Sequence, residues 1–250
     1  MVYEKRIESL GELITCTKEI CGKWPHRDMW FRGQEDASWD LTPAVHRSYS
    51  GNQEHDMIAE FILEAPLRYA ACPGPSDYSR WLALMQHYGL PTRLLDWTKS
   101  PLVAAYFALA HEGHKDSAVW GLFPVRLNEV VSGHQGYLQL GAPQVAAFFG
   151  RAFGHAEDSP TGALAVQAET IDTRILVQQS VFTIHGDNTP LQTLYADEEI
   201  LVKFILSAEK LDMMFIEIEK AGMSRKFLFP DLQNLSLSLS SSPRTLGEKS

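Results

Sequence analysis

Residues 86–108 read QHYGLPTRLLDWTKSPLVAAYFA, and this stretch decides the fold. Gly89 ends a helix that the preceding apolar spacing predicts over residues 78–88. Ser100 followed by Pro101 is typical of a helix start, because serine caps free backbone N–H groups and proline suits the first helical position. We therefore expect a helix, a polar segment without a regular period, and a second helix that runs to about residue 111.

Helices and strands alternate on both sides of this stretch, without the regular rhythm of a parallel α/β fold. Apolar residues at helical spacing predict further helices, with Pro66 interrupting one of them. These helices cover residues 7–21, 53–71, 143–153 and 208–221. Apolar and β-branched runs predict strands at residues 29–31, 118–125, 175–177, 181–184 and 200–206. We expect an α+β fold with small mixed β-sheets and flanking helices.

The 250-residue chain has the composition of an ordinary globular protein, with 45% apolar and 21% charged residues. We expect one domain over residues 1–235 and a fraying polar tail over residues 236–250. The net charge of −9 argues against broad binding to nucleic acid or to anionic membranes. The first residues do not resemble a signal peptide and no apolar run is long enough to span a membrane, so we expect a cytoplasmic protein.

Neither a disulfide framework nor a metal site is predicted. Cys16, Cys21 and Cys72 are odd in number and lack paired spacing. His111 and His114 lie near a predicted helix end without a third ligand close in sequence, so a solvated helix terminus explains them better. The signatures of phosphate-binding loops, dinucleotide folds, zinc proteases and serine hydrolases are absent.

Arg32 follows an apolar run directly and precedes Gly33, a pattern that favours contact with an anion. A guanidinium binds phosphate or carboxylate through two parallel donors, and a glycine lets the backbone approach a ligand closely. The alternative is that Arg32 is buried against an internal carboxylate, with Asp96 as the obvious partner.

Two further segments carry more hydrogen-bonding groups than packing requires. In residues 86–101, Tyr88 and Trp97 could stack a flat ring while the helix starting at Pro101 directs its N–H groups at an anion; the alternative is a proline-stabilised loop that supports the core. In residues 174–183, the adjacent amides of Gln178 and Gln179 could hold a ribose hydroxyl. The alternative is that these glutamines face solvent.

These segments resemble the FRG domain, a family named for its Phe-Arg-Gly motif. Phe31-Arg32-Gly33, with Leu41-Thr42-Pro43 and Arg47 after it, resembles the opening of the domain, and residues 86–108 resemble its central block. The family's later block is resembled by Arg174, Gln178, Gln179 and Phe182. The resemblance covers roughly residues 25–185. It implies a family of bacterial and phage proteins but no particular activity.

The order of the three segments is also similar to the Arg–Ser–Glu class of ADP-ribosyltransferases. This resemblance implies an ADP-ribosyltransferase-like fold and NAD as ligand or substrate, with Arg32 on the pyrophosphate and Thr98 and Ser100 at the nicotinamide ribose. Gln179 falls where that class has a glutamate, and glutamine keeps the hydrogen bond but loses the charge. Another acid would have to stabilise the reacting ribose. The candidates are Asp96, Glu169, Glu198 and Glu199.

The candidate residues are therefore of two kinds. Those expected to be catalytic are Arg32, Thr98, Ser100 and Gln179. Further ligand-binding candidates are Gly33, His87, Tyr88, Arg93, Asp96 and Trp97. The resemblance implies an ADP-ribosyltransferase or NAD glycohydrolase that acts as a bacterial toxin or phage-defence effector. One alternative is a nucleotide-binding or sensing module without turnover, and another is a scaffold in which Arg32, Arg93 and Asp96 form a buried charge network.

Overall fold

The strands form one mixed sheet of eight, with helices around it. The computed structural model describes residues 2–23, 28–110, 115–156, 158–169, 173–195 and 199–240. In sheet order the strands are β1 (Tyr3–Ile7), β8 (Leu201–Leu206), β4 (Ser117–Leu122), β2 (Trp30–Gln34), β3 (Leu94–Thr98), β7 (Ser180–His185), β6 (Ala163–Gln167) and β5 (Leu138–Gln139). The pairs β1–β8 and β5–β6 are parallel and the others are antiparallel. The α+β class is confirmed, in one sheet rather than several.

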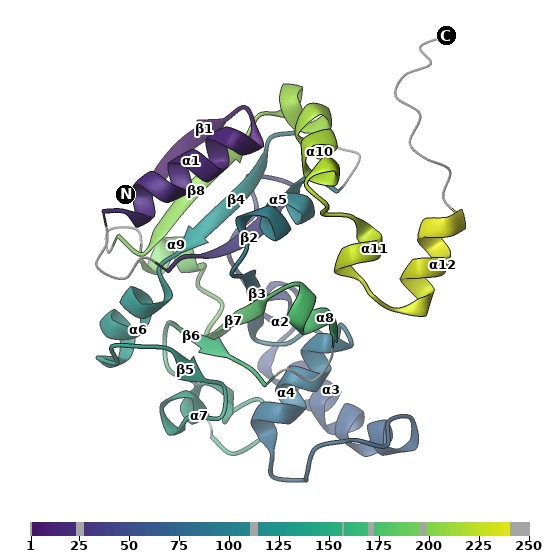
Figure 1. Cartoon of the computed structure of the whole chain (residues 1–250). Coiled ribbons are helices and arrows are strands. Elements are labelled where there is room, and N and C mark those ends of the chain that lie inside the picture. The colour runs from purple at the N-terminus through teal and green to yellow at the C-terminus, as the bar shows by residue number, and fades with distance from the viewer. Residues whose placement is uncertain are drawn as a thin grey trace.

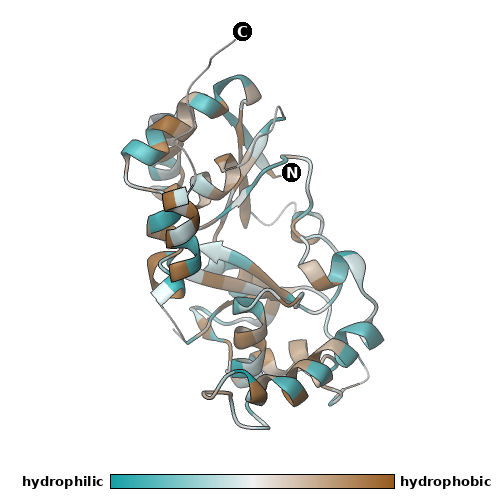
Figure 2. Cartoon of the chain, turned by 90° about the vertical axis from the view of Figure 1, so that its right-hand side faces the viewer, coloured by the Kyte–Doolittle hydropathy of each residue, from teal (hydrophilic) through white to brown (hydrophobic). Residues whose placement is uncertain are grey.

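The sheet is nearly divided between β2 and β3. These two strands pair only at Phe31 and Thr98, whereas β2 pairs with β4 and β3 pairs with β7 along five residues each. We call β1, β8, β4 and β2 the upper half and β3, β7, β6 and β5 the lower half, as they lie in Figure 1. Turned by 90°, the strands of the two halves run in different directions (Figure 2). The line where the halves meet is called the seam below.

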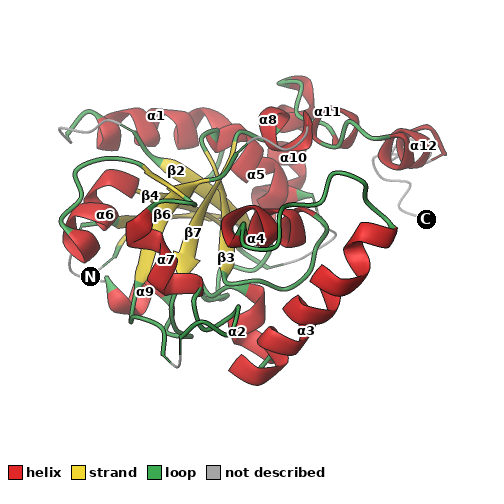
Figure 3. Cartoon of the chain, turned by 90° about the horizontal axis from the view of Figure 1, so that it is seen from below, coloured by secondary structure: helices red, strands yellow, loops and turns green. Residues whose placement is uncertain are grey.

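Twelve α-helices flank the sheet within the described residues (Figure 3). They are α1 (Leu10–Cys21), α2 (Ala44–Ser48), α3 (Gly51–Glu64), α4 (Tyr78–His87), α5 (Pro101–Leu109), α6 (Pro124–Ser132), α7 (Pro143–Phe149), α8 (Thr173–Val177), α9 (Leu191–Leu194), α10 (Leu211–Lys220), α11 (Arg225–Leu228) and α12 (Leu232–Ser240). There are also two short 3₁₀ helices: Ala65–Leu67 follows α3, and Ala208–Lys210 precedes α10. No helix in the described part of the chain is both long and apolar enough to cross a bilayer.

Each half of the sheet has its own apolar core. Helices α1, α5 and α10 pack on the upper half, where Leu13, Ala104 and Met214 are fully buried. Helices α3, α4 and α7 pack on the lower half, where Leu82 and Val145 are fully buried. A third cluster, which contains three tryptophans, includes residues of both halves. Different helices thus cover the two halves, and the third cluster connects the halves across the seam.

Several predicted helices are confirmed, and the serine, proline and glycine residues expected at their ends lie there. Ser100 caps α5 by accepting a hydrogen bond from the Val103 amide at 3.3 Å, and Pro101 is its first residue. Gly89 follows α4 with a φ of +82°, a backbone conformation that glycine adopts without steric cost. Pro66 ends α3 as expected, and a 3₁₀ turn follows.

The structure corrects the expected elements in the N-terminal and central parts of the chain. Ile7 ends strand β1 rather than beginning a helix, and α1 starts at Leu10. Residues 94–98, for which no period was evident, form β3, where four of the five residues are buried. A buried strand shows no alternation of polar and apolar residues, so the usual signal is missing. The strand expected over 118–125 ends at Leu122, because Pro124 starts α6.

Further corrections lie in the C-terminal half. Residues 175–177 belong to helix α8 rather than to a strand, and the strand starts at Ser180. The helix expected over 143–153 ends at Phe149. Residues 236–240 of the tail expected to fray belong to helix α12, and residues 241–250 lie outside the described residues. His111 and His114 lie outside the described residues.

Candidate functional site

A cleft of about 510 Å³ opens at the seam and is lined from both halves of the sheet. The upper half contributes Arg32 and Gly33 from β2, and the lower half contributes Asp96, Trp97 and Thr98 from β3. The cleft is also lined by Gln34, Glu35, Arg47, Gln86, Phe107, Arg174, Gln178 and Ser180. Its volume is in the range of small-molecule sites. The sequence segments at 31–34, 86–98 and 174–180 therefore meet in one place.

Arg32 reaches across the seam. Its Nη1 donates a hydrogen bond to the backbone carbonyl of Asp96 at 2.8 Å. Its Nε is buried and has no hydrogen-bond partner among the described residues. Burial lowers the pKa of Arg32, the Asp96 carboxylate opposes this shift, and the Arg47 cation adds to it. A buried guanidinium N–H without an acceptor is costly, so an acceptor in the cleft would stabilise this arrangement.

Asp96 presents its carboxylate on the exposed side of β3. Oδ2 accepts a hydrogen bond from Nε2 of Gln86 at 2.8 Å. Oε1 of Gln86 accepts in turn from the Thr92 hydroxyl at 2.5 Å, which orients the amide. The expectation that Arg32 pairs with the Asp96 carboxylate is corrected, since Arg32 bonds the main chain of that residue. The carboxylate is thus held in position by an amide and keeps its charge facing the cleft.

The cleft is locally basic in an acidic chain. Three guanidinium groups, of Arg32, Arg47 and Arg174, line it against the two carboxylates of Glu35 and Asp96. Arg47 is exposed and forms no ion pair within the described residues. Arg174 lies over the ring of Phe229 at 4.8 Å from its centre. An anionic ligand would therefore be attracted to this part of a molecule whose net charge is −9.

Thr98 and Ser100 are both engaged in local structure. The Thr98 hydroxyl donates to the carbonyl of Gln178 at 2.7 Å and accepts from the Ser100 amide at 3.1 Å. Ser100 caps α5 and is not among the residues that line the cleft. Of the two hydroxyl residues expected to share a hollow with Arg32, Thr98 lies there and Ser100 lies behind it.

Gln179 and Gln178 have different environments. Gln179 is exposed, has a φ of +49°, and is outside the cleft lining. Gln178 is buried in the cleft wall, and its Nε2 donates to the carbonyl of Leu228 at 2.9 Å. The left-handed conformation of Gln179 ends α8 and turns the chain into β7. The residue at the position resembling the transferase glutamate is therefore outside the cleft lining, and its neighbour Gln178 is part of that lining.

Arg93, Tyr88 and His87 lie outside the main cleft. Arg93 forms a buried, two-armed ion pair with Glu54, with Nε–Oε1 at 2.9 Å and Nη2–Oε2 at 2.5 Å. Tyr88 is 59% exposed and lines a separate hollow. His87 lines a recess of about 50 Å³ that shares Gln86, Asp96 and Arg174 with the cleft. The charge network expected among Arg32, Arg93 and Asp96 is corrected, because Arg93 pairs with Glu54 instead.

Trp97 and Gly33 line the cleft but also serve packing. Trp97 is buried, and its indole N–H donates to Thr183 Oγ1 at 3.0 Å. A side chain at Gly33 would meet the Ala104 carbonyl oxygen of α5 at 2.0 Å from its Cβ. The glycine of the Phe-Arg-Gly motif therefore allows a helix, rather than a ligand, to approach β2 closely.

Among the acids considered as replacements for a catalytic glutamate, Asp96 lines the cleft. Glu169 forms an exposed ion pair with Arg80, with the carboxylate oxygen 2.6 Å from Nη2. Glu199 is exposed and outside the cleft lining, and Glu198 lies outside the described residues. No cluster of three or more His, Cys, Asp or Glu side chains that could hold a metal occurs among the described residues.

Sequence reasoning missed the partners that hold these groups in place. Gln86 belongs to the polar segment 86–101, but no local sequence pattern indicates that it orients Asp96. The burial of Glu54 is indicated by its position, four residues before Ile58 on the apolar face of a predicted helix. A lone acid on such a face indicates a buried cation opposite, because an unpaired buried charge is costly.

Among known protein families, one family model matches the part of the chain that contains Arg32 and Asp96. Residues 27–117 match the family model of the FRG domain, in agreement with the resemblance of the Phe-Arg-Gly motif and of residues 86–108. The match ends before Arg174 and Gln178, which complete the cleft. No curated protein and no solved structure matches the chain.

Proposed function

Starting from an FRG domain that contributes Arg32 and Asp96 to one cleft, we propose that the chain binds NAD at the seam and cleaves it. The reaction is removal of nicotinamide, by transfer of ADP-ribose to an acceptor or to water. One observation carries the proposal: a guanidinium whose buried N–H has no partner among the described residues and an oriented carboxylate lie in the same 510 Å³ cleft. A diphosphate and a reacting ribose need these two groups.

Arg32 is the group for the diphosphate. Its Nη1 is anchored on the Asp96 carbonyl, and neither Nε nor Nη2 donates to another described residue, so both can donate to phosphate oxygens. Such charge-assisted pairs are about twice as strong as neutral hydrogen bonds. Arg47 and Arg174 add positive charge to the lining of the same cleft. The cleft thereby offers more cationic groups than a single diphosphate requires.

Asp96 is the group for the ribose. When the bond between ribose C1′ and the nicotinamide nitrogen breaks, the electron pair leaves with nicotinamide and the ribose becomes cationic. A fixed carboxylate stabilises that cation more than it stabilises the substrate, and this difference accelerates the reaction. The oxygen of water, or of an acceptor hydroxyl, then forms the new bond to C1′ and releases its proton to solvent. Gln86 holds the carboxylate in place for this step.

The second candidate is a binding module without turnover. Two observations favour it. The hydroxyls of Thr98 and Ser100 already form hydrogen bonds with backbone groups of the fold. Position 179 has an uncharged glutamine where the transferases have a glutamate. In that case NAD or ADP-ribose would bind at Arg32 and remain intact.

Nicotinamide release from NAD separates the two candidates. The enzyme proposal expects release by the full chain, reduced about 100-fold or more in Asp96→Asn because the charge is removed. Arg32→Lys should weaken binding, since it keeps the charge but loses the two-armed geometry. Arg126→Ala, at a half-buried arginine of α6 that pairs with Glu129 and is outside the cleft lining, serves as the control and should behave as wild type.

Ligand-induced thermal stabilisation provides the second measurement. Saturation with ADP-ribose at about 100 times its dissociation constant should add about 2.7 kcal/mol to the free energy of unfolding. Stabilisation without nicotinamide release would favour the binding module. Absence of both, with Arg32→Lys indistinguishable from wild type, would overturn the proposed function in either form.

An NAD-consuming enzyme would be harmful to the cell that contains it, which fits a toxin or a phage-defence effector. Induced expression in a bacterial host should lower cellular NAD and arrest growth, and Asp96→Asn should restore both. The acceptor, if there is one besides water, would be identified by transfer of label from the adenylate part of NAD.

A further inference from the structure

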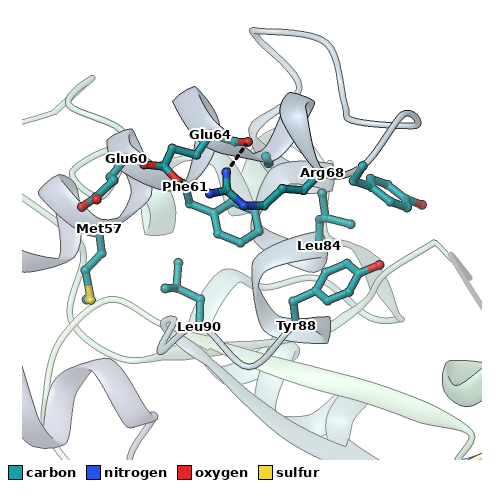
Figure 4. A pocket seen from close by; sticks show the side chains of 10 residues that line it. Met57, Glu60, Phe61, Glu64, Arg68, Leu84, Tyr88 and Leu90 are labelled. Carbon is teal, nitrogen blue, oxygen red and sulfur yellow. Dashed lines mark hydrogen bonds and ion pairs between the residues drawn. The ribbon is translucent and has the colours of Figure 1, made fainter. Parts of the chain in front are cut away.

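A second hollow, separate from the cleft, lies between α3 and the end of α4. Figure 4 shows it from close by, with Met57 and Phe61 of α3 on one side and Leu84, Tyr88 and Leu90 on the other. Its volume is about 540 Å³. It shares Leu90 with the cleft at the seam and has its other lining residues to itself.

The walls of this hollow are apolar and aromatic. Met57, Phe61, Leu84 and Leu90 supply aliphatic, thioether and ring surface, and Tyr69 and Tyr88 meet edge to face with their ring centres 6.0 Å apart. A concave apolar surface of this size is unfavourable in contact with water and is typical of a small-molecule site. The body of the ligand should therefore be apolar.

Three charged side chains of α3 and the turn after it lie along one edge of the hollow (Figure 4). Glu64 and Arg68 neutralise one another in an ion pair of 2.8 Å. Glu60 forms no ion pair or hydrogen bond within the described residues, so one negative charge at this edge is uncompensated. Arg68 is the basic side chain among the described residues that line this hollow, and Glu64 already pairs with it. A positively charged group is therefore favoured here and a carboxylate is disfavoured.

We propose that this hollow binds a small organic cation, an amine with an apolar body. The body packs on Phe61, Leu84 and Leu90, and the ammonium group lies against Glu60. Tyrosine faces near the site add attraction for a cation. The hollow and the cleft can be occupied together, because they share a single wall residue.

Three matched probes test the charge preference: 4-phenylbutylamine, 4-phenylbutanol and 4-phenylbutyrate. They are titrated into the full chain and followed by calorimetry and by two-dimensional NMR. The amine should bind about three- to tenfold more tightly than the alcohol, and the acid more weakly than either. Resonances of Phe61, Leu84 and Leu90 should shift. Equal affinities, or no binding by any of the three at millimolar concentration, would overturn the proposal.

Two variants locate the binding. Glu60→Gln should bring the affinity for the amine down to that for the alcohol and leave the alcohol unaffected. Met57→Trp, which fills the hollow, should abolish binding of both. Glu19→Gln, at an exposed acid of α1, is the matched control and should retain the preference. Unchanged amine binding in Met57→Trp would show that the site lies elsewhere.

The outcome is independent of the proposed function. ADP-ribose binding at the cleft is measured on the same variants, and Glu60→Gln should leave it unchanged. A chain that binds ADP-ribose but none of the amines refutes the second site alone. A chain that binds the amine but no nucleotide refutes the proposed function alone.

Discussion

Arg93 and Glu54 form a two-armed ion pair in which the arginine is 1% exposed. Glu54→Gln is expected to lower the free energy of unfolding by about 3–5 kcal/mol, because it leaves a guanidinium buried without its countercharge. Chemical denaturation with urea measures the change. Glu64→Gln on the same helix removes an exposed pair with Arg68 and should cost less than about 1 kcal/mol. Equal costs for the two variants would contradict the assignment of Arg93 to the core.

His185 is fully buried, and burial lowers its pKa to about 3, with the His46 and Arg32 charges adding to the shift. In the unfolded chain its pKa is about 6.5. Between these values the unfolded chain binds a proton that the folded chain does not. Stability from His185 is therefore complete above about pH 6.5 and is lost as the pH falls toward 3, with a slope of up to about 1.4 kcal/mol per pH unit.

The comparison with His185→Gln isolates this effect. Denaturation at pH 7, 6 and 5 should show that wild type loses stability toward acid more steeply than the variant. The glutamine can still bond Thr183, which now contacts His185 Nε2 at 2.9 Å. Parallel pH dependences in the two proteins would mean that His185 takes up a proton in the folded state near its ordinary pKa.

For single residues, the sequence indicates which side chains are functional candidates better than it indicates the residues that they contact. Local pattern indicates Arg32 and Asp96, the resemblance to ADP-ribosyltransferases indicates Thr98, and all three line one cleft. Arg93 was singled out by the same density of polar groups, yet its partner is Glu54, 39 residues earlier. Partners this distant depend on how α3 packs against the lower half, and local pattern carries no information on that.

The packing of α5 on β2 depends on Gly33. A Cβ there would lie 2.0 Å from the Ala104 carbonyl oxygen and 2.6 Å from the Ala108 nitrogen, both backbone atoms that cannot turn aside. Gly33→Ala should force α5 away from the strand and cost about 3 kcal/mol or more. Differential scanning calorimetry measures it.

Gly74→Ala is the control for this substitution. Nothing lies within 4 Å of a Cβ at Gly74, and its φ is not positive. The alanine should be neutral or stabilise by a few tenths of a kcal/mol through the unfolded chain. If Gly33→Ala proved as harmless as Gly74→Ala, the helix would not need the glycine, and a role at the ligand would be the better explanation for the motif.

Elements with chemical boundary signals were predicted well, and elements that depend on context were not. Ser100-Pro101 and Gly89 mark α5 and α4 correctly, since caps act within one turn. Ile175-Leu176-Val177 has strand propensity but forms α8, because propensity is weaker than tertiary packing. Its carboxyl end is held by the Thr98 hydroxyl on the Gln178 carbonyl, a contact between residues 80 positions apart.

At the level of the whole molecule, the seam is the feature that could not be predicted from the sequence. Strand β3 had no visible period, so the pairing of β2 with β3 at Phe31 and Thr98 alone was not foreseeable. The α+β class followed from composition and the order of elements. The cleft lies where β2 and β3 separate, and there the Arg32 side chain, rather than backbone pairing, reaches the Asp96 carbonyl.

A ligand that occupies this cleft should join the two halves. ADP-ribose carries a diphosphate for Arg32 of the upper half and a ribose for the cleft residues near Gln178 of the lower half, whereas inorganic pyrophosphate has only the group for Arg32. Hydrogen exchange should therefore slow in residues 30–34 with either compound, and in residues 174–180 only with ADP-ribose. At about 100 times the dissociation constant, openings that require ligand release should slow about 100-fold. Arg32→Lys should reduce both effects. Protection of a single half by ADP-ribose would mean that the ligand does not span the seam, and the assignment of Asp96 to the ribose would then fail with it.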